Sequence, residues 1–258
     1  MNILFTICGR AGSKGVQGKN TKMLCGQPIV HYTLAAYLAY LDRYQGNDIC
    51  VLSLNTDSEL LRQQVEATNI DYVFVPRKAE LAGDFVSKKD VLKDTFLETE
   101  KITGIAFDIM VDLDLTSPIR TEEDIFQTIQ TLIGDEYADI AYSVTNSRRS
   151  PYFNMVKQDE DGYFRTVFQS DFVARQQAPV CYDMNASIYA YRREYLLSDR
   201  IMDRNALIWV MDDTGVLDID SEEDWELMQV IISYFVENKV EYNNVNKALK
   251  EIKQITEN

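Results

Sequence analysis

Long apolar runs are absent from this sequence, and no positively charged leader precedes its first apolar segment, residues 2–8. A membrane-spanning helix needs about 20 apolar residues and a secretory leader has a basic start, so neither membrane insertion nor secretion is expected. We therefore expect a cytoplasmic protein with no membrane partner. The single histidine, His31, lies in a helical pattern and is interpreted as structural, so chemistry that depends on a histidine base is not expected.

Cysteines are few and unpaired in the sequence. The four of them, Cys8, Cys25, Cys50 and Cys181, contain no C-x-x-C pair. Because paired cysteines are the usual signature of zinc sites and disulfide frameworks, we expect neither and predict free thiols.

Basic residues are outnumbered, with 26 Lys and Arg against 41 Asp and Glu and a net charge of −15. Nucleic-acid binding needs a basic face that neutralises phosphates, so a nucleic-acid partner is not expected. A small anionic substrate remains compatible with this balance if positive charge is concentrated locally. Such a concentration exists, because no acidic residue precedes Asp42 while Arg10, Lys14 and Lys19 lie close together.

Apolar runs of strand length alternate with helical patterns along most of the 258 residues, 46% of which are hydrophobic. This alternation predicts an α/β domain of parallel βαβ units with helices on both faces of the sheet. Ligands in such folds bind at the carboxyl ends of the strands. We expect strands at 2–8, 48–54, 71–75, 108–115, 139–144, 185–191 and 207–212, helices at 28–41, 59–68, 88–99, 121–133 and 221–238, and a polar, weakly amphipathic helix over the last twenty residues.

The alternation breaks between residues 146 and 183. Two β-rich runs there flank a turn signal at 159–162, which predicts a hairpin. A hairpin that leaves the main layers of an α/β enzyme is a natural dimerisation element, and we interpret 146–183 as such an insert.

The first expected strand ends in a loop rich in both glycine and positive charge, in which residues 9–19 read GRAGSKGVQGK. Amides of a glycine-rich turn can converge on phosphate oxygens, and Lys or Arg adds charge-assisted hydrogen bonds. Phosphate is therefore the expected ligand, and the alternative is a solvated loop. The loop matches neither the P-loop spacing nor the dinucleotide fingerprint, so an ordinary P-loop ATPase and a Rossmann dehydrogenase are not supported.

In its spacing this loop resembles the opening of the cytidylyltransferases that activate nonulosonic acids, the family of CMP-sialic acid synthetases. That opening has the form A-R-x-G-S-K-G, followed by K-N and G-x-P, and it is matched by Arg10, Gly12, Ser13, Lys14, Gly15, Lys19, Asn20, Gly26 and Pro28. Five further motifs follow in order, at 55–57, 77–84, 114–121, 174–176 with 185–189, and 216–220. The resemblance extends from residue 3 to about residue 227.

The resemblance implies a three-layer, Rossmann-like nucleotidyltransferase fold in one domain, 1–258, and a homodimer whose insert reaches the partner's sugar site. In such an enzyme the C2 hydroxyl of the sugar acid attacks the α-phosphorus of CTP and pyrophosphate leaves. The positions matched to catalysis are Arg10, Lys14, Lys19 and Asp218. Those matched to CTP are Gly12, Ser13, Asn20 and Arg77, with Asn20 at the cytosine edge, and those matched to the sugar acid are Asp114, Thr116, Ser117, Arg175, Gln176 and Asn185.

Asp218 and Asp220 are two residues apart, so in an extended segment both carboxylates would face one side. Two hard oxygen donors suit Mg²⁺, which takes one or two carboxylates and completes its shell with water and phosphate. The alternative is that this acidic segment charges and caps a helix N-terminus, a role that we expect for the following residues, 221–224.

The departures from the family pattern concern the sugar. Asp114 stands where sialic acid synthetases usually carry Gln, and Leu115 replaces a Pro. An ionised Asp accepts hydrogen bonds but cannot donate them, so the resemblance does not by itself imply sialic acid as the sugar. With these departures the chain looks more like the branch that activates legionaminic acid. Two alternatives remain open at this point: an octulosonic acid (KDO) type of cytidylyltransferase, and a non-catalytic nucleotide-binding protein on the same fold.

Overall fold

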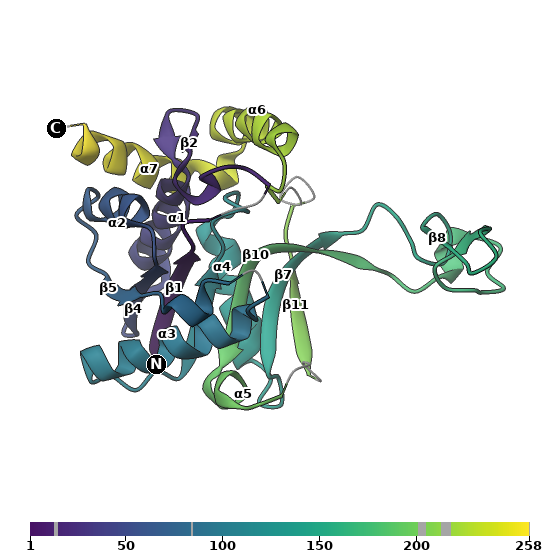
Figure 1. The fold of residues 1–258 in the computed structure, drawn as a ribbon, viewed down its shortest axis with the longest axis horizontal. Helices are drawn as coiled ribbons and strands as arrows, with labels where there is room; N and C mark the ends of the chain where they lie inside the picture. Colours follow the sequence, from purple (N-terminus) through teal and green to yellow (C-terminus); the bar gives the residue numbers. More distant parts are fainter. Residues whose placement is uncertain (13–14, 84, 201–204, 213–217, 258) are drawn as a thin grey trace.

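The computed structural model describes residues 1–12, 15–83, 85–200, 205–212 and 218–257 (Figure 1). Its centre is a seven-stranded sheet with the strand order β11-β7-β10-β6-β1-β4-β5. These strands are β1 (Asn2–Gly9), β4 (Ile49–Thr56), β5 (Val73–Pro76), β6 (Ile109–Leu113), β7 (Ile140–Asn146), β10 (Tyr182–Arg192) and β11 (Ala206–Val210). All the strands predicted from the sequence are therefore confirmed, with shifts of a few residues at their ends.

The sheet is not wholly parallel. β10 runs antiparallel to both of its neighbours, β6 and β7, whereas the other neighbouring pairs are parallel. The prediction of parallel βαβ units is therefore wrong for β10. The chain passes from β7 to β10 through the excursion 147–181 and not through a helical crossover, so the returning strand pairs antiparallel.

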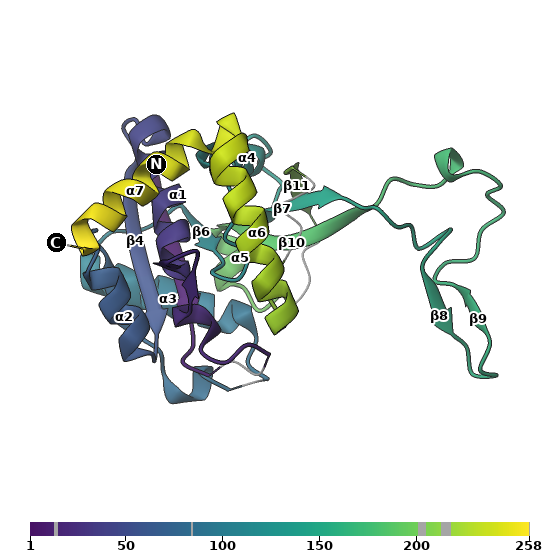
Figure 2. The same cartoon turned by 90° about the horizontal axis from the view of Figure 1, so that it is seen from above.

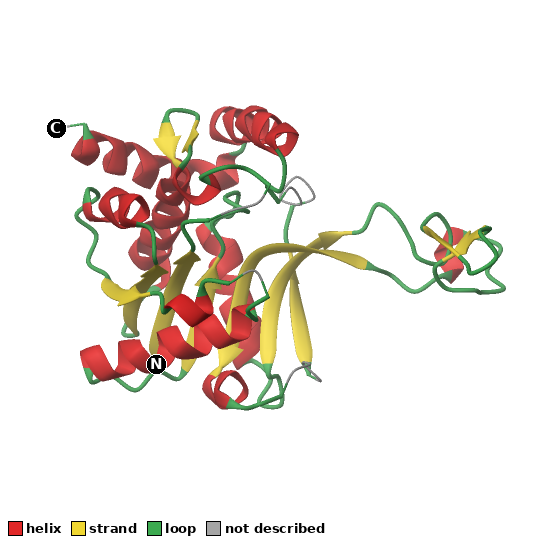
Figure 3. Ribbon diagram, viewed as in Figure 1, coloured by secondary structure: helices red, strands yellow, loops and turns green. Residues whose placement is uncertain are grey.

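Helices cover both faces of the sheet, which confirms the three-layer prediction (Figure 3). β1 shows why, because Ile3, Phe5 and Ile7 join the larger apolar cluster on one face while Leu4 joins the smaller cluster on the other. The smaller cluster lies under α3 (Lys88–Thr103) and α5 (Arg193–Leu197). The larger cluster contains residues of α1 (Ile29–Tyr44), α2 (Glu59–Glu66), α4 (Glu122–Ile133), α6 (Glu222–Asn238) and α7 (Asn243–Thr256).

The C-terminal helix α7 packs more firmly than its sequence predicts. Val245, Ala248, Leu249 and Ile252 are buried along one face, and the helix lies against α1. The expectation of a weakly amphipathic helix is therefore wrong, because the few apolar residues of α7 recur at helical spacing and form a continuous stripe.

Between β7 and β10 the chain forms an arm, residues 147–181, that projects far from the sheet in both views (Figures 1 and 2). Near its end β8 (Val156–Gln158) and β9 (Phe164–Thr166) pair antiparallel, which confirms the predicted hairpin. The arm carries many exposed apolar side chains, among them Tyr163, Phe164, Phe168 and Val173.

The single histidine, interpreted as structural from the sequence, lies in the core. His31 is buried, and its ring nitrogens lie within hydrogen-bond distance of Gln27 Oε1 (3.0 Å) and of the Gln64 carbonyl oxygen (3.2 Å). The four cysteines are all free. Within the described part of the chain, the helices are either too short or too polar to cross a bilayer.

Candidate active site

A cavity of about 450 Å³ opens at the carboxyl ends of the parallel strands. The loop after β1 forms one wall, the segment after β5 forms another, and the segment after β6 forms the floor. The structure brings together here most of the positions predicted for the site: Arg10, Gly12, Lys19, Asn20, Arg77, Asp114, Thr116 and Asp220. The predicted residues Ser13 and Lys14 lie outside the described residues.

The glycine-rich loop packs directly on the acidic segment that precedes α6. A Cβ atom added to Gly15 would lie 2.0 Å from the carbonyl oxygen of Asp220, so only glycine permits this approach. The amide of Ala11 donates to Asp57 Oδ1 (2.7 Å), and Asn20 Nδ2 donates to the carbonyl of Arg10 (3.0 Å). The side chain of Asn20 therefore supports the loop, while its predicted role at the cytosine edge stays a prediction.

Lys19 joins the loop to the same acidic segment. It begins the short 3₁₀ helix η1 (Lys19–Thr21), and its ammonium donates to the carbonyl of Ile219 and lies 3.3 Å from Asp220 Oδ1. The Lys19 side chain is 15% exposed, whereas that of Asp220 is 80% exposed. The Lys19 ammonium is thus held at the cavity wall next to the Asp220 carboxylate, which is open to solvent.

Asp218 is half-buried, and its Oδ1 has no hydrogen-bond partner among the described residues. Burial raises the pKa of this carboxyl, and the neighbouring carboxylates Asp114 and Asp220 add to the effect. A buried carboxylate oxygen without a donor, close to other carboxylates, fits a divalent cation. Residues 218–220 form a loop and not a strand, so the two carboxylates differ in exposure and the geometry assumed for an extended segment does not apply.

Neither Asp218 nor Asp220 caps the helix α6 that follows them. Ser221 is the N-cap of α6 and accepts from the amide of Asp224, whose carboxylate accepts in return, so these two residues form the capping box. In the described part of the chain no group of three or more His, Cys, Asp or Glu side chains is arranged to hold a metal ion. A cation here would therefore take two carboxylates at most and complete its shell with phosphate and water.

Arg77 follows β5 and is oriented by a buried amide. Its Nε donates to Asn55 Oδ1 (2.7 Å) and its Nη2 to the carbonyl of Asn55 (3.4 Å), and Asn55 is fully buried at the end of β4. The guanidinium is therefore fixed at the cavity wall, unlike that of a mobile surface arginine.

Lys88 lies at the cavity although the sequence motifs did not assign it. Its ammonium lies 2.7 Å from Asp112 Oδ2 and 2.5 Å from Asp114 Oδ2. Burial alone would raise the pKa of Asp114, but Lys88 and the amide and hydroxyl hydrogens of Thr116 outweigh it and lower this pKa to about 2. Asp114 is thus held ionised.

Three of the predicted sugar-binding residues do not line this cavity. The Ser117 carbonyl accepts from Arg120 and Ser187 in the interior, and Asn185 Oδ1 accepts from Ser143 Oγ (2.7 Å) between β7 and β10. Gln176 is exposed on η3 (Arg175–Gln177) of the arm. Another predicted sugar-binding residue, Arg175, is on the same short helix, and its side chain lies outside the described atoms.

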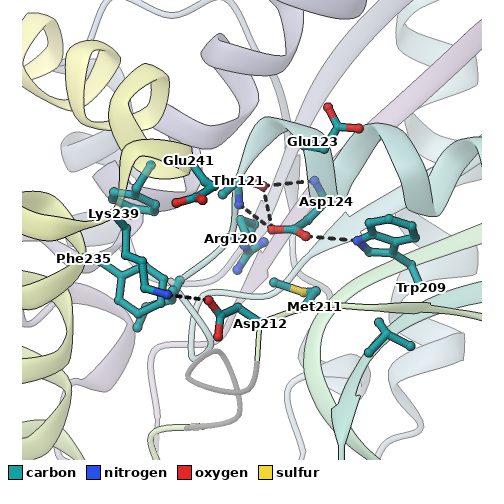
Figure 4. Close-up of a pocket in the computed structure, with 13 residues that line it drawn as sticks. Arg120, Thr121, Glu123, Asp124, Trp209, Met211, Asp212, Phe235, Lys239 and Glu241 are labelled. Atoms are coloured by element: carbon teal, nitrogen blue, oxygen red, sulfur yellow. Dashed lines mark hydrogen bonds and ion pairs between the residues drawn. The ribbon is translucent and has the colours of Figure 1, made fainter.

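Arg120 is a second residue that sequence reasoning missed. It is fully buried, and its Nη2 donates to the carbonyls of Asp114 and Ser117, so it holds the turn that forms the cavity floor. Burial lowers the pKa of Arg120 to about 10 although nearby carboxylates oppose this. Behind this turn lies a separate cavity of about 280 Å³, where Asp124 accepts from Trp209 Nε1 and from the Thr121 amide (Figure 4).

A family model described as cytidylyltransferase matches residues 4–239. The chain is 34% identical to the CMP-N,N'-diacetyllegionaminic acid synthase of Campylobacter jejuni, over 90% of this chain and 95% of that protein. It is 33% identical to the post-translational flagellin modification protein B of Campylobacter coli, over 89% of this chain and 94% of that protein. It is 27% identical to an N-acylneuraminate cytidylyltransferase of Escherichia coli, over 96% of this chain but 57% of that longer protein.

Solved structures show the same fold at low sequence identity. A CMP:2-keto-3-deoxy-manno-octonic acid synthetase complexed with CTP has a TM-score of 0.61 and 17% identity, over 90% of this chain and 99% of that one. A cytidylyltransferase from Leptospira borgpetersenii has a TM-score of 0.56 and 15% identity, over 99% of this chain and 97% of that one. At such identities the likeness establishes the fold alone.

Proposed function

The chain belongs to the cytidylyltransferase family, and we propose that it transfers CMP from CTP to the C2 hydroxyl of a nonulosonic acid and releases pyrophosphate. The observation that carries the proposal is the meeting of the glycine-rich loop, Lys19, Arg77 and Asp220 at one cavity, beside Asp218. Cations from the loop after β1 and from the segment after β5 suit a triphosphate, and the carboxylates next to Lys19 suit a metal-bound phosphate.

Catalysis in this proposal comes from positioning and electrostatics. Charge accumulates on the phosphates as pyrophosphate leaves, so fixed cations stabilise the transition state more than the ground state. Arg10 and Lys19 lie where they can contact the triphosphate, with Ser13 and Lys14 next to them in the chain. Arg77, held by Asn55, contacts the nucleotide from the facing wall.

We assign Asp218 and Asp220 as the ligands of a divalent cation, Mg²⁺ in our proposal. Bound there, the cation would neutralise charge on the phosphate oxygens. Lys19, which lies 3.3 Å from Asp220 Oδ1, holds this carboxylate close to the glycine-rich loop. The orphaned Oδ1 of Asp218 supports the assignment.

For the sugar acid we propose legionaminic acid or a close relative of it. Asp114 presents an ionised acceptor at the cavity floor, so it selects a hydroxyl or amide donor on the sugar. The identity of 34% to the CMP-N,N'-diacetyllegionaminic acid synthase of Campylobacter jejuni, against 27% to the N-acylneuraminate cytidylyltransferase of Escherichia coli, supports this choice over N-acetylneuraminic acid.

We further propose a homodimer in which the arm reaches the partner's cavity. The arm projects away from the sheet of its own chain (Figure 1). It carries Arg175 and Gln176, which were matched to the sugar acid, together with exposed apolar side chains. Sedimentation velocity of the Phe168→Glu/Val173→Glu double variant tests this assembly. A dimer in the unmodified chain and a monomer in the variant are expected, and a monomer in both would refute the proposal.

Pyrophosphate release tests the function as a whole. The chain is incubated with CTP and Mg²⁺ and with N-acetylneuraminic, legionaminic, pseudaminic or octulosonic acid, and a parallel series omits the metal. Metal-dependent release with legionaminic acid is the expected result. Release with octulosonic acid alone would favour the KDO-type alternative, and silence across the panel together with a CTP-induced rise in Tm would favour a non-catalytic nucleotide-binding protein.

A further inference from the structure

The cavity floor contains a cluster of one cation and two carboxylates, of which the proposed function assigns a role to Asp114 alone. Lys88 Nζ bridges Asp112 Oδ2 at 2.7 Å and Asp114 Oδ2 at 2.5 Å, and it lies 5.5 Å from the ring centroid of Tyr189. Asp112 is fully buried and also accepts from Thr6 Oγ (3.1 Å). Lys88 is 42% exposed, so the cluster links a buried charge to the open cavity.

The position of Lys88 in its helix is unfavourable unless it serves this cluster. It is the first residue of α3, where the helix dipole disfavours a cation, and the N-cap Ser87 makes no side-chain capping hydrogen bond. The next residue, Lys89, donates to the carbonyls of Ser198 (3.0 Å) and Arg200 and so points away from the cluster. Two adjacent lysines with separate partners provide a matched pair for experiment.

The hydrogen bonds of Asp114 indicate what the cluster presents to a ligand. Its Oδ1 accepts from both the amide (2.9 Å) and the hydroxyl (2.8 Å) of Thr116, while its Oδ2 meets Lys88. An ionised carboxylate offers about four acceptor positions, so among the described residues Oδ2 keeps one position for a ligand. Because the low pKa keeps Asp114 ionised, this position accepts a donor and repels a phosphate or a carboxylate.

We propose that Lys88 is a positioning residue for the sugar acid: by bridging Asp112 and Asp114 it fixes the Asp114 carboxylate where Oδ2 accepts a hydrogen bond from a hydroxyl or amide N–H of the sugar. The inference rests on the proposed function and deepens it. The CTP phosphates meet the other cations of the cavity, so Lys88 acts on binding of the second substrate.

The test measures KM for each substrate separately, by pyrophosphate release, in the unmodified chain and in Lys88→Met, Lys88→Arg and Lys89→Met. Lys88→Met is expected to raise KM for the sugar acid about tenfold, since a charged hydrogen-bonding group loses its fixed position, and to change KM for CTP less than about twofold. Lys88→Arg keeps the charge and is expected to restore most of the affinity. Lys89→Met loses two hydrogen bonds of the same helix turn and is expected to leave both KM values unchanged.

Lys88→Met leaves Asp112 as a buried charge without a cation, which can prevent folding. The Lys88→Met/Asp112→Asn double variant removes that charge and leaves Asp114 intact, so it carries the test if the single variant is unstable. Equal changes in KM for the sugar acid in the Lys88 and Lys89 variants, or a parallel rise in KM for CTP, would overturn the role of Lys88 while leaving the proposed function standing. An unmodified chain that releases no pyrophosphate with any sugar acid would instead overturn the proposed function and this inference together.

Discussion

The contact between Gly15 and Asp220 gives a sharp prediction about the phosphate loop. In Gly15→Ala the added Cβ would lie 2.0 Å from the carbonyl oxygen of Asp220, whereas real Cβ atoms do not approach within 3.0 Å. The backbone fixes the position of this Cβ and its partner is a backbone carbonyl, so no side-chain rotation relieves the clash. The loop and the segment 218–220 must therefore separate by about 1 Å, and a displacement of this size between reacting groups lowers turnover by about 100-fold.

The assay compares kcat/KM for CTP in Gly15→Ala and in a control, Gly83→Ala. A Cβ on Gly83, which lines the same cavity, would lie 3.5 Å from Val86 Cγ2, an ordinary contact. We expect a fall of about 100-fold in Gly15→Ala, equivalent to about 2.7 kcal/mol of transition-state stabilisation, and less than about threefold in Gly83→Ala. A Gly15→Ala variant that folds, as judged by Tm, and keeps kcat/KM within threefold would refute the reasoning.

Three further predictions follow from the charged groups of the site. Asp218→Asn is expected to lower turnover by orders of magnitude and to raise Tm at pH 7, because the raised native pKa of Asp218 means that its ionised form destabilises the fold. An unchanged rate over a Mg²⁺ titration would contradict the metal assignment. Arg77→Lys cannot reproduce the paired contacts to Asn55, so KM for CTP should rise by about tenfold or more while KM for the sugar acid stays constant in the same assay. The pKa of Asp114 is lowered to about 2, so the ionised carboxylate stabilises the fold above pH 3.8, its ordinary pKa, and this contribution is lost as the pH falls through about 2. Asp114→Asn should therefore flatten the acid limb of a Tm-against-pH curve between these values. An identical acid limb in the variant would contradict the ion pair with Lys88.

The layers of the fold could be predicted because local pattern and burial agree. In β1 the alternation of Ile3, Leu4 and Phe5 serves the two faces of the sheet, and in α4 Thr121 and Asp124 mark the helix start with a capping box. The direction of β10 could not be predicted, because a strand has the same sequence pattern in either direction and only the connection through the arm reverses it.

The candidate site, like the fold, could be predicted from the sequence only in part. Motif spacing predicted Arg10, Lys19 and Arg77 for one site, and all three line the same cavity. Arg10 and Arg77 directly follow β1 and β5 at the ligand-binding edge of the sheet, where such a site is expected. Motif spacing also matched Asn185 to the sugar acid, but Asn185 lies inside β10, where its amide oxygen accepts from Ser143 in the interior, so it does not line this cavity. Lys88 was missed because its partners, Asp112 on β6 and Asp114 just after it, are more than twenty residues away in the chain, and such pairing is visible only in three dimensions.

The way in which the arm is attached to the sheet would allow this segment of the chain to be inserted or deleted as a unit. Asn146 and Tyr182 lie opposite each other in the ladder between β7 and β10, so the two ends of the excursion meet side by side at the sheet. A short turn joining them would close the ladder as an ordinary hairpin and leave the register of every other strand as it is. A single insertion or deletion could therefore add or remove the whole arm. The length and the side chains of the arm could also change in evolution while the sheet and the helices that cover it stay the same.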